Sequence, residues 1–138
     1  MQLTDHFTLE EMTFSQTATR KNIDNTPSPV VIAALKRICA LLEQVRTLVG
    51  APIRVSSGYR SVALNKAIGG AASSKHVLGL AADITAAGMT PLALAKLISQ
   101  STLQFDQVIF EGTSVHIGLS SEAPRRQILT ARFGDGHT

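Results

Sequence analysis

The sequence predicts an α+β fold in which helices pack against one small antiparallel sheet, within a single domain spanning residues 1–138. Helix patterns come first along the chain, and strand patterns follow with one helix among them. The 138 residues suit one ordinary domain and are enough to bury a core without disulfides. Apolar residues make up 44% of the chain and charged residues 17%, which excludes a disordered tail, a coiled coil and a fibre.

The first half of the chain carries the strongest helix signals. Thr8 is the expected N-cap of a short helix, because Glu11 at the third helical position completes a capping box. A long helix is predicted over 29–49, beginning at the proline after Ser28 and ending at Gly50. Its apolar side chains recur every three or four residues and form one stripe, which comprises Val31, Leu35, Ile38, Leu42, Val45 and Val49.

The other segments are short. A polar, turn-rich stretch over 20–27 is expected to be a surface loop. Two further helices are predicted, over 61–67 and 91–100. Alternation of apolar and polar residues predicts strands over 53–55, 81–85, 107–110, 115–119 and 127–133, the last at the sheet edge. The turn over 111–114 would join two of these strands as a hairpin.

Charge and composition exclude several classes of function. A net charge of +3 suits an anionic polymer but is too weak to indicate nucleic acid, and 4% aromatic residues with no tryptophan leave few platforms for bases. The longest apolar run, over 30–35, is far shorter than the roughly 20 residues that a membrane span needs. The single cysteine, Cys39, lies in the long helix and is expected to be a small buried core residue.

The terminal segments carry weaker signals. Residues 1–6 show neither the basic start nor the apolar stretch of a secretion signal, so we expect a protein made in the cytoplasm without one. His6 and His137 lie in polar terminal segments and are expected to be exposed. Arg125, Arg126 and Arg132 are expected to form a solvated basic face, with attraction to anionic wall polymers as the alternative.

Two histidines and one aspartate fall where a metal site would need them. Strand alternation turns the apolar neighbours of His116 and of Asp83 to the core, so these two side chains project together from the other face. His76, in a loop just before the strand of Asp83, would complete a set of three. Two imidazoles and one carboxylate are a normal set for catalytic zinc and leave a fourth position to water, whose pKa falls to roughly 7. Taken separately, each residue also has an ordinary explanation as a satisfied polar or turn residue.

Five short motifs then match one family. Residues 74–83 read SKHVLGLAAD and fit the pattern S-x-H-x-x-G-x-A-x-D, and residues 57–61 read SGYRS. Residues 115–117 read VHI, and the segments 7–13 and 25–27 read FTLEEMT and NTP. In this order the motifs resemble those of the M15 zinc peptidases, and the last two resemble a subgroup common in phage and prophage genomes. The resemblance covers residues 3–119.

The resemblance implies a Hedgehog-like DD-peptidase fold with a zinc site on one face of the sheet. Members of the family are D-alanyl-D-alanine carboxypeptidases or dipeptidases and L-alanyl-D-glutamate endopeptidases, which cleave peptidoglycan stem peptides. Carried over to this chain, His76, Asp83 and His116 would bind Zn²⁺. Arg60 would hold the scissile carbonyl or the developing oxyanion, with a solvated loop arginine as the alternative. Ser74 would either brace its loop or hydrogen-bond the substrate.

The chain departs from the family at the catalytic acid/base. The best-known members carry a Glu or Asp three residues before the last histidine ligand, where this chain has Thr113. Glu111, five residues before His116, could reach the site if the intervening turn bulges; its alternative is a solvent-facing turn residue. Asp106 is a weaker substitute, because it begins the preceding strand.

These patterns lead to a functional hypothesis with an open alternative. We expect a monomeric, single-domain zinc peptidase of peptidoglycan stem peptides, encoded by a phage or prophage as an endolysin and acting on the cell wall after release. Partners other than the peptidoglycan peptide, whether nucleic acid or membrane, are not expected. The alternative is a non-catalytic zinc- or peptidoglycan-binding module of the same fold, such as a phage structural protein. A metal-dependent nuclease is disfavoured, because no basic-aromatic groove accompanies the histidines. The sequence leaves open which peptide bond is cut.

Overall fold

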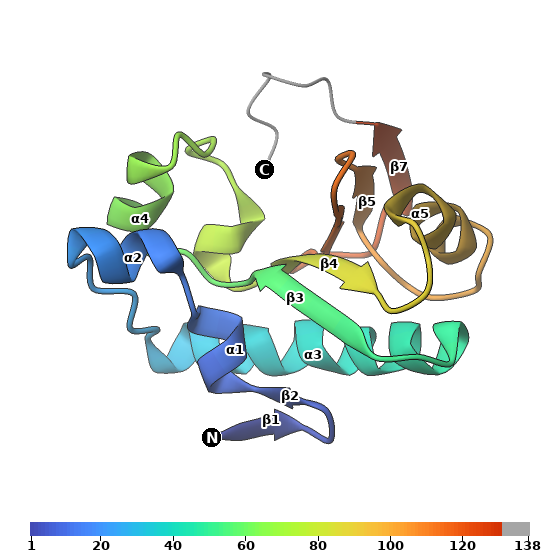
Figure 1. Ribbon diagram of the computed structural model, residues 1–138, viewed down its shortest axis with the longest axis horizontal. Helices are drawn as coiled ribbons and strands as arrows, with labels where there is room; N and C mark the ends of the chain where they lie inside the picture. The colour runs from blue at the N-terminus through green and yellow to red at the C-terminus, as the bar shows by residue number, and fades with distance from the viewer. Residues whose placement is uncertain (131–138) are drawn as a thin grey trace.

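The computed structural model describes residues 1–130 and shows a mixed α+β architecture (Figure 1). Its elements, in chain order, are β1 (Gln2–Thr4), β2 (Phe7–Thr8), α1 (Leu9–Thr13), α2 (Gln16–Lys21), α3 (Pro29–Val49), β3 (Ile53–Ser57), α4 (Val62–Ala67), the 3₁₀ helix η1 (Lys75–Leu78), β4 (Ala81–Ala86), α5 (Pro91–Ser99), β5 (Gln107–Phe110), β6 (Val115–Gly118) and β7 (Gln127–Thr130). No helix within 1–130 is long and apolar enough to span a bilayer.

The predicted sheet has five strands in the order β3-β4-β6-β5-β7. Its first three neighbouring pairs are antiparallel, as predicted, whereas β5 and β7 at one edge run parallel. The chain passes from β6 over to the far side of β5, so β7 takes the direction opposite to β6 and the same direction as β5. The part of the last predicted strand that continues beyond residue 130 lies outside the described residues.

Helix α3 lies along one face of the sheet and supplies much of the core (Figure 1). Its predicted stripe is confirmed: the buried core joins Leu35, Ile38, Leu42 and Val45 of α3 to Ala82, Ile84, Val115 and Ile117 of the two central strands. Cys39 is fully buried in the same cluster, and burial raises the pKa of its thiol to about 12. The cysteine is therefore a core side chain, as expected.

The helix caps follow the sequence signals. Thr8 and Glu11 form the reciprocal capping box of α1, and the Ser28 hydroxyl accepts from the backbone N–H of Val31 at the start of α3. Gly50 ends α3 in the left-handed conformation at φ 74°. Each cap of this kind stabilises its helix by about 1 kcal/mol.

Four short elements were not predicted. Strands β1 and β2 have three and two residues, too few for alternation to be visible in the sequence. Helix α2 is six residues long and buries only Ala18, so it has no apolar stripe, and it overlaps the start of the predicted surface loop. Helix η1 occupies part of the segment predicted as a loop around His76.

Of the expected solvated basic face, Arg125 is exposed but ion-paired, and Arg126 is only half-exposed. Arg125 forms a two-pronged ion pair with the buried Asp106, with Nε 3.0 Å from Oδ1 and Nη2 2.9 Å from Oδ2. Arg126 stacks over the ring of Phe105, its guanidinium carbon 4.6 Å from the ring centroid. Both arginines therefore tie the segment before β7 to the sheet. Arg132 lies outside the described residues, as does His137.

The Asp106→Asn variant is expected to lower the free energy of unfolding at pH 7 by about 1–3 kcal/mol, because it leaves a charge-assisted pair incomplete. The hydrogen bonds of Arg125 hold the pKa of Asp106 below its usual range, so this stabilisation is present above about pH 4 and lost as pH falls further. Denaturant unfolding at pH 7 and pH 3 checks both points, and Asp5→Asn at an exposed carboxylate is the control. A deficit equal at both pH values would contradict the assignment.

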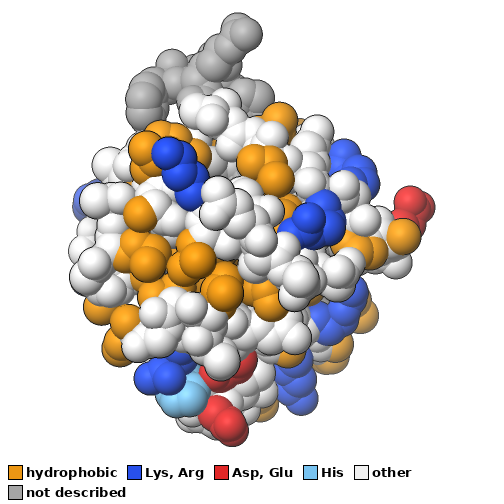
Figure 2. All heavy atoms as spheres, turned by 90° about the vertical axis from the view of Figure 1, so that its right-hand side faces the viewer, with side chains coloured by type: hydrophobic (Ala, Val, Ile, Leu, Met, Phe, Trp, Pro, Cys, Tyr) orange, Lys and Arg blue, Asp and Glu red, His pale blue; other side chains and the backbone are white. Residues whose placement is uncertain are grey.

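The end of the molecule formed by α5 and the C-terminal half of α3 is partly apolar. Figure 2 shows hydrophobic side chains gathered there, with basic groups around them. Leu48 of α3 and Leu92 of α5 are large apolar side chains with exposed surface. This end is formed by helices that lie apart from the face of the sheet that carries Asp83 and His116.

Candidate metal centre

The two central strands place Asp83 and His116 opposite each other. Strands β4 and β6 pair in a register that aligns these two residues, and their apolar neighbours enter the core on the other face. His76 comes from η1, where Ser74 caps the 3₁₀ turn by accepting from the backbone N–H of His76 at 3.3 Å. The three side chains predicted as ligands thus converge on one side of the sheet.

The geometry of this cluster is compact and buried. Nε2 of His76 and Nδ1 of His116 each lie 3.1 Å from the same oxygen of Asp83, Oδ1. One possible ligand atom from each residue falls within 4.8 Å of the others. The imidazole rings meet edge to face with centroids 5.1 Å apart. All three residues are buried, so no mobile surface side chain has to be recruited to form the set.

The hydrogen bonding of His76 shows that the cluster fits a cation. Its Nδ1 lies 2.7 Å from the carbonyl oxygen of Gly58, which only accepts, so Nδ1 carries the proton and donates it. In the neutral ring Nε2 then has a lone pair, and this lone pair faces the carboxylate of Asp83. A cation between them, either a proton or a metal ion, relieves the repulsion of two facing lone pairs. Two imidazole nitrogens and a carboxylate oxygen are a donor set that zinc accepts.

The environment of the cluster favours an ionised aspartate. Burial opposes ionisation of Asp83, but His76 and His116 offset it and hold the pKa of the carboxyl well below its usual range. Burial lowers the pKa of His116, against the opposing effect of Asp83. A metal ion binds an ionised carboxylate and deprotonated ring nitrogens, so the shifts at Asp83 and His116 are in the direction that metal binding requires.

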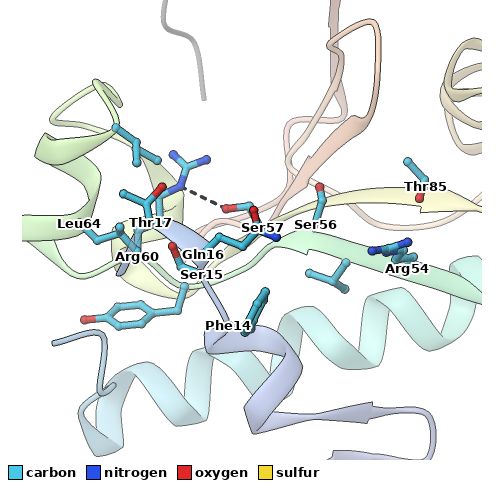
Figure 3. Close-up of a pocket in the computed structure, with 13 residues that line it drawn as sticks. Phe14, Ser15, Gln16, Thr17, Arg54, Ser56, Ser57, Arg60, Leu64 and Thr85 are labelled. Carbon is cyan, nitrogen blue, oxygen red and sulfur yellow. Dashed lines mark hydrogen bonds between the residues drawn. The ribbon is translucent and has the colours of Figure 1, made fainter. Parts of the chain in front are cut away.

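Arg60 lies beside the cluster and is buried, so the alternative of a solvated loop arginine is wrong. It is 5% exposed, and its Nε donates to the hydroxyl of Ser57 at 3.2 Å (Figure 3). Nη2 lies 3.5 Å from Oδ2 of Asp83, and Nη1 lies 3.4 Å from the side-chain oxygen of Asn65. These last two contacts are long, so the guanidinium retains donor capacity for another group. Burial lowers the pKa of Arg60, and the charge of Asp83 opposes that shift.

Glu111 reaches toward the cluster from the turn between β5 and β6. The turn closes through the backbone N–H of Glu111 and the carbonyl of Ser114, with Gly112 at φ 89°. Oε2 of Glu111 is the one buried side-chain oxygen or nitrogen without a hydrogen-bond partner among residues 1–130. Burial and then the nearby charge of Asp83 raise the pKa of Glu111 well above its usual range, with Arg60 opposing. The carboxyl is therefore placed to exchange a proton rather than to face solvent.

The other candidates take different positions. Thr113 is exposed on the turn, and Asp106 is committed to Arg125, so neither presents a free carboxylate to the cluster. Ser74 acts as a helix cap on the wall of a hollow beside His116. Gly79 ends η1 at φ 71°, and a Cβ there would lie 2.9 Å from Val31 of α3. A glycine at this position permits both the turn and the close approach to α3.

Two supporting residues were missed as site residues. Asn65 of α4 accepts from Arg60 and donates to the carbonyl of Ala71 at 2.9 Å. Asn25 donates to the carbonyl of Tyr59 and accepts from the backbone N–H of Ser61, so it clamps the loop of Arg60 from both sides. The NTP motif pointed to Asn25 without a role, whereas nothing in the sequence pointed to Asn65.

Two hollows open beside the cluster. The first, about 510 Å³, is bounded by Arg60, by the outer side of β3 and by the segment joining α1 to α2 (Figure 3). The second, about 600 Å³, includes His116, Ser74 and Lys75 in its wall. The first hollow thus adjoins the cluster through Arg60, and the second through His116.

The fold and the cluster define a class of protein: a small α+β domain with a buried His-Asp-His metal centre, a buried arginine and a nearby carboxyl group. The model of the family described as peptidase M15 matches residues 5–119, most of the chain. The protein belongs to the peptidase M15 family. It is also 42% identical over 72 residues to the zinc D-Ala-D-Ala carboxypeptidase of Streptomyces albus G. That match covers 48% of this chain and 28% of the relative, so the chain matches less than a third of the relative's length.

Proposed function

We propose that the protein is a zinc-dependent peptidase that hydrolyses peptide bonds of peptidoglycan stem peptides. The observation that carries the proposal is the buried carboxyl group of Glu111 next to Asp83, in a cluster that fits a cation. A purely structural metal site has no need of a further buried carboxyl group, whose burial is costly. Membership of the M15 family and the similarity to a zinc carboxypeptidase support the same reaction class.

His76, Asp83 and His116 would hold the zinc. When bound there, zinc supplies a Lewis acid that polarises the scissile carbonyl and makes a water molecule acidic. The Gly58 carbonyl fixes the tautomer of His76, so that its Nε2 lone pair faces the ion. Oδ2 of Asp83 remains directed at Arg60, which orients the carboxylate.

Glu111 would transfer protons, and Arg60 would stabilise the negative charge that develops on the substrate. Oε2 of Glu111 takes the proton from the attacking water and later gives it to the leaving amine. Arg60 donates to the oxygen on which negative charge develops, and its hydrogen bonds to Ser57 and Asn65 keep the guanidinium in place. Ser74, on the wall beside His116, is the further substrate-binding candidate.

We further propose the type of peptidase, its biological setting and its oligomeric state. Hollows beside the cluster would admit substrate for a D,D-carboxypeptidase or for an L-alanyl-D-glutamate endopeptidase. The phage-type motifs over 7–13 and 25–27 support an endolysin that is made in the cytoplasm and reaches the wall after release. We propose that residues 1–138 act as one monomeric catalytic domain.

A second candidate function is a non-catalytic module of the same fold that binds zinc or peptidoglycan. The observation in its favour is Thr113, which stands where the best-known family members carry the acid/base. Incubation of the zinc-loaded protein with purified peptidoglycan separates the two. Release of new amino groups is expected for the peptidase, whereas binding to peptidoglycan without release would support the module. Plasmid DNA in a parallel incubation should stay intact.

The Arg60→Lys variant is expected to lower kcat by about 10²–10³-fold while zinc stays bound. Lysine keeps the charge but cannot reach Ser57, Asn65 and a developing oxyanion with one rigid group. Steady-state kinetics with a stem peptide, together with zinc analysis, measures the effect. Arg20→Lys, at an exposed arginine of α2, is the matched control. Unchanged kcat in Arg60→Lys would remove this residue from the chemistry.

A further inference from the structure

The first hollow carries a cationic side chain that the proposed chemistry does not use. Arg54 of β3 lies in its wall with Ser56 and Thr85, at the end opposite Arg60 and Leu64 (Figure 3). Arg54 is exposed and forms no ion pair or side-chain hydrogen bond with residues 1–130. The wall contains two arginines and no acidic residue. The hollow is therefore a positively charged space with one uncommitted guanidinium.

The sheet register places Arg54 near the metal cluster. Arg54 pairs with Thr85 across β3 and β4, and Thr85 is two residues beyond Asp83 on the same strand. Alternate residues of a strand share a face, so Thr85 projects on the same side as Asp83. Two residues of strand correspond to about 7 Å, which an extended peptide spans with about two residues. A substrate that extends from the cluster along this hollow would place near Arg54 a residue about two positions from the scissile bond.

We propose that Arg54 is a specificity-determining residue that binds a carboxylate of the substrate, one or two residues from the scissile bond. The inference rests on the proposed peptidase function and narrows its substrate class to acidic peptides. The planar guanidinium of an arginine can form two parallel hydrogen bonds with a carboxylate. Arg54 would give up no ion pair or hydrogen bond with residues 1–130 to bind one. The proposed chemistry assigns the spare donor capacity of Arg60 to the developing oxyanion, so Arg54 is the arginine of this wall that is left for a substrate carboxylate.

The test compares three peptides on one protein background. Dissociation constants are measured by calorimetry on zinc-loaded protein carrying Glu111→Gln, which keeps the bound peptide intact. The peptides are L-Ala-γ-D-Glu-L-Lys-D-Ala, the same peptide with the D-Glu carboxylate converted to an amide, and the same peptide with its C-terminal carboxylate converted to an amide. Comparison of the two amides shows whether the bound group is the D-Glu carboxylate or the C-terminal carboxylate.

We expect one of the two amides to bind about fivefold more weakly than the parent peptide, the loss typical of an ion pair in a half-open site. Adding Arg54→Gln should abolish this difference, because the partner of the carboxylate is gone. Lys36→Gln, which removes the same charge from an exposed position on α3, should preserve it. A difference that survives Arg54→Gln, or equal affinities for all three peptides, would overturn the inference. Failure of every peptide to bind would instead contradict the proposed function together with it.

Discussion

Replacing Glu111 by glutamine is expected to lower kcat by about 10²–10⁴-fold and to leave the zinc content unchanged. Glutamine has nearly the same shape but cannot accept the proton of the attacking water or return it to the leaving amine. The turn between β5 and β6 should stay closed, because its hydrogen bond joins the backbones of Glu111 and Ser114. The loss should therefore arise in the chemical step rather than in folding.

Steady-state kinetics and zinc analysis on the same preparation measure the effect of Glu111→Gln. The surface variant Glu10→Gln changes the same chemical group on α1, where the carboxylate pairs with the N-terminal amine, and should keep full activity. A Glu111→Gln protein as active as the wild type would exclude this residue as the acid/base. The hypothesis would then need another proton acceptor, which neither Thr113 nor the ion-paired Asp106 supplies.

Replacing Asp83 by asparagine is expected to remove activity by removing the metal. The carboxylate oxygen that faces both imidazoles is replaced by a neutral amide, so the site loses its negative charge and one strong ligand. Zinc affinity should fall by more than 100-fold, beyond the 10–100-fold typical of changes in residues that only support ligands. Arg60 also loses its charged partner at 3.5 Å.

Zinc titration against a competing chelator, with circular dichroism to verify folding, measures the result for Asp83→Asn. Asp106→Asn is the matched control, because it changes the same group at a buried position outside the cluster and should retain zinc. A folded Asp83→Asn protein with wild-type zinc affinity would show that the metal lies elsewhere.

Local signals in the sequence were sufficient for the main elements. The apolar stripe and caps of α3 predict its limits, and alternation in β4 and β6 predicts that Asp83 and His116 face the same way. These properties depend on neighbours in the chain. By contrast, β1, β2 and α2 are too short or too polar to show such periodicity. Their conformation depends on contacts with the rest of the fold. The parallel edge pair of β5 and β7 depends on the path of a connection, which no local pattern shows.

The metal ligands could be predicted from the sequence, whereas the positions of the neighbouring Arg60 and Glu111 could not. His76, Asp83 and His116 follow from residue type and motif. The burial of Arg60 does not, because it depends on Ser57, Asn65 and Asp83, which come from three separate segments. Glu111 stayed ambiguous for the same reason: its sequence position fits a solvent-facing turn, and only the packed turn brings its carboxyl group toward Asp83 and Arg60.

The most direct test of the central claim is mass spectrometry of defined stem peptides after incubation with the protein, in its zinc-loaded form and after removal of metal by a chelator. We predict cleavage at one peptide bond by the zinc-loaded protein, no cleavage after chelation, and recovery when zinc is restored. Cleavage that persists without metal would contradict the metal-centred account. Intact peptides in the presence of the folded, zinc-loaded protein would contradict the peptidase itself and favour the binding module.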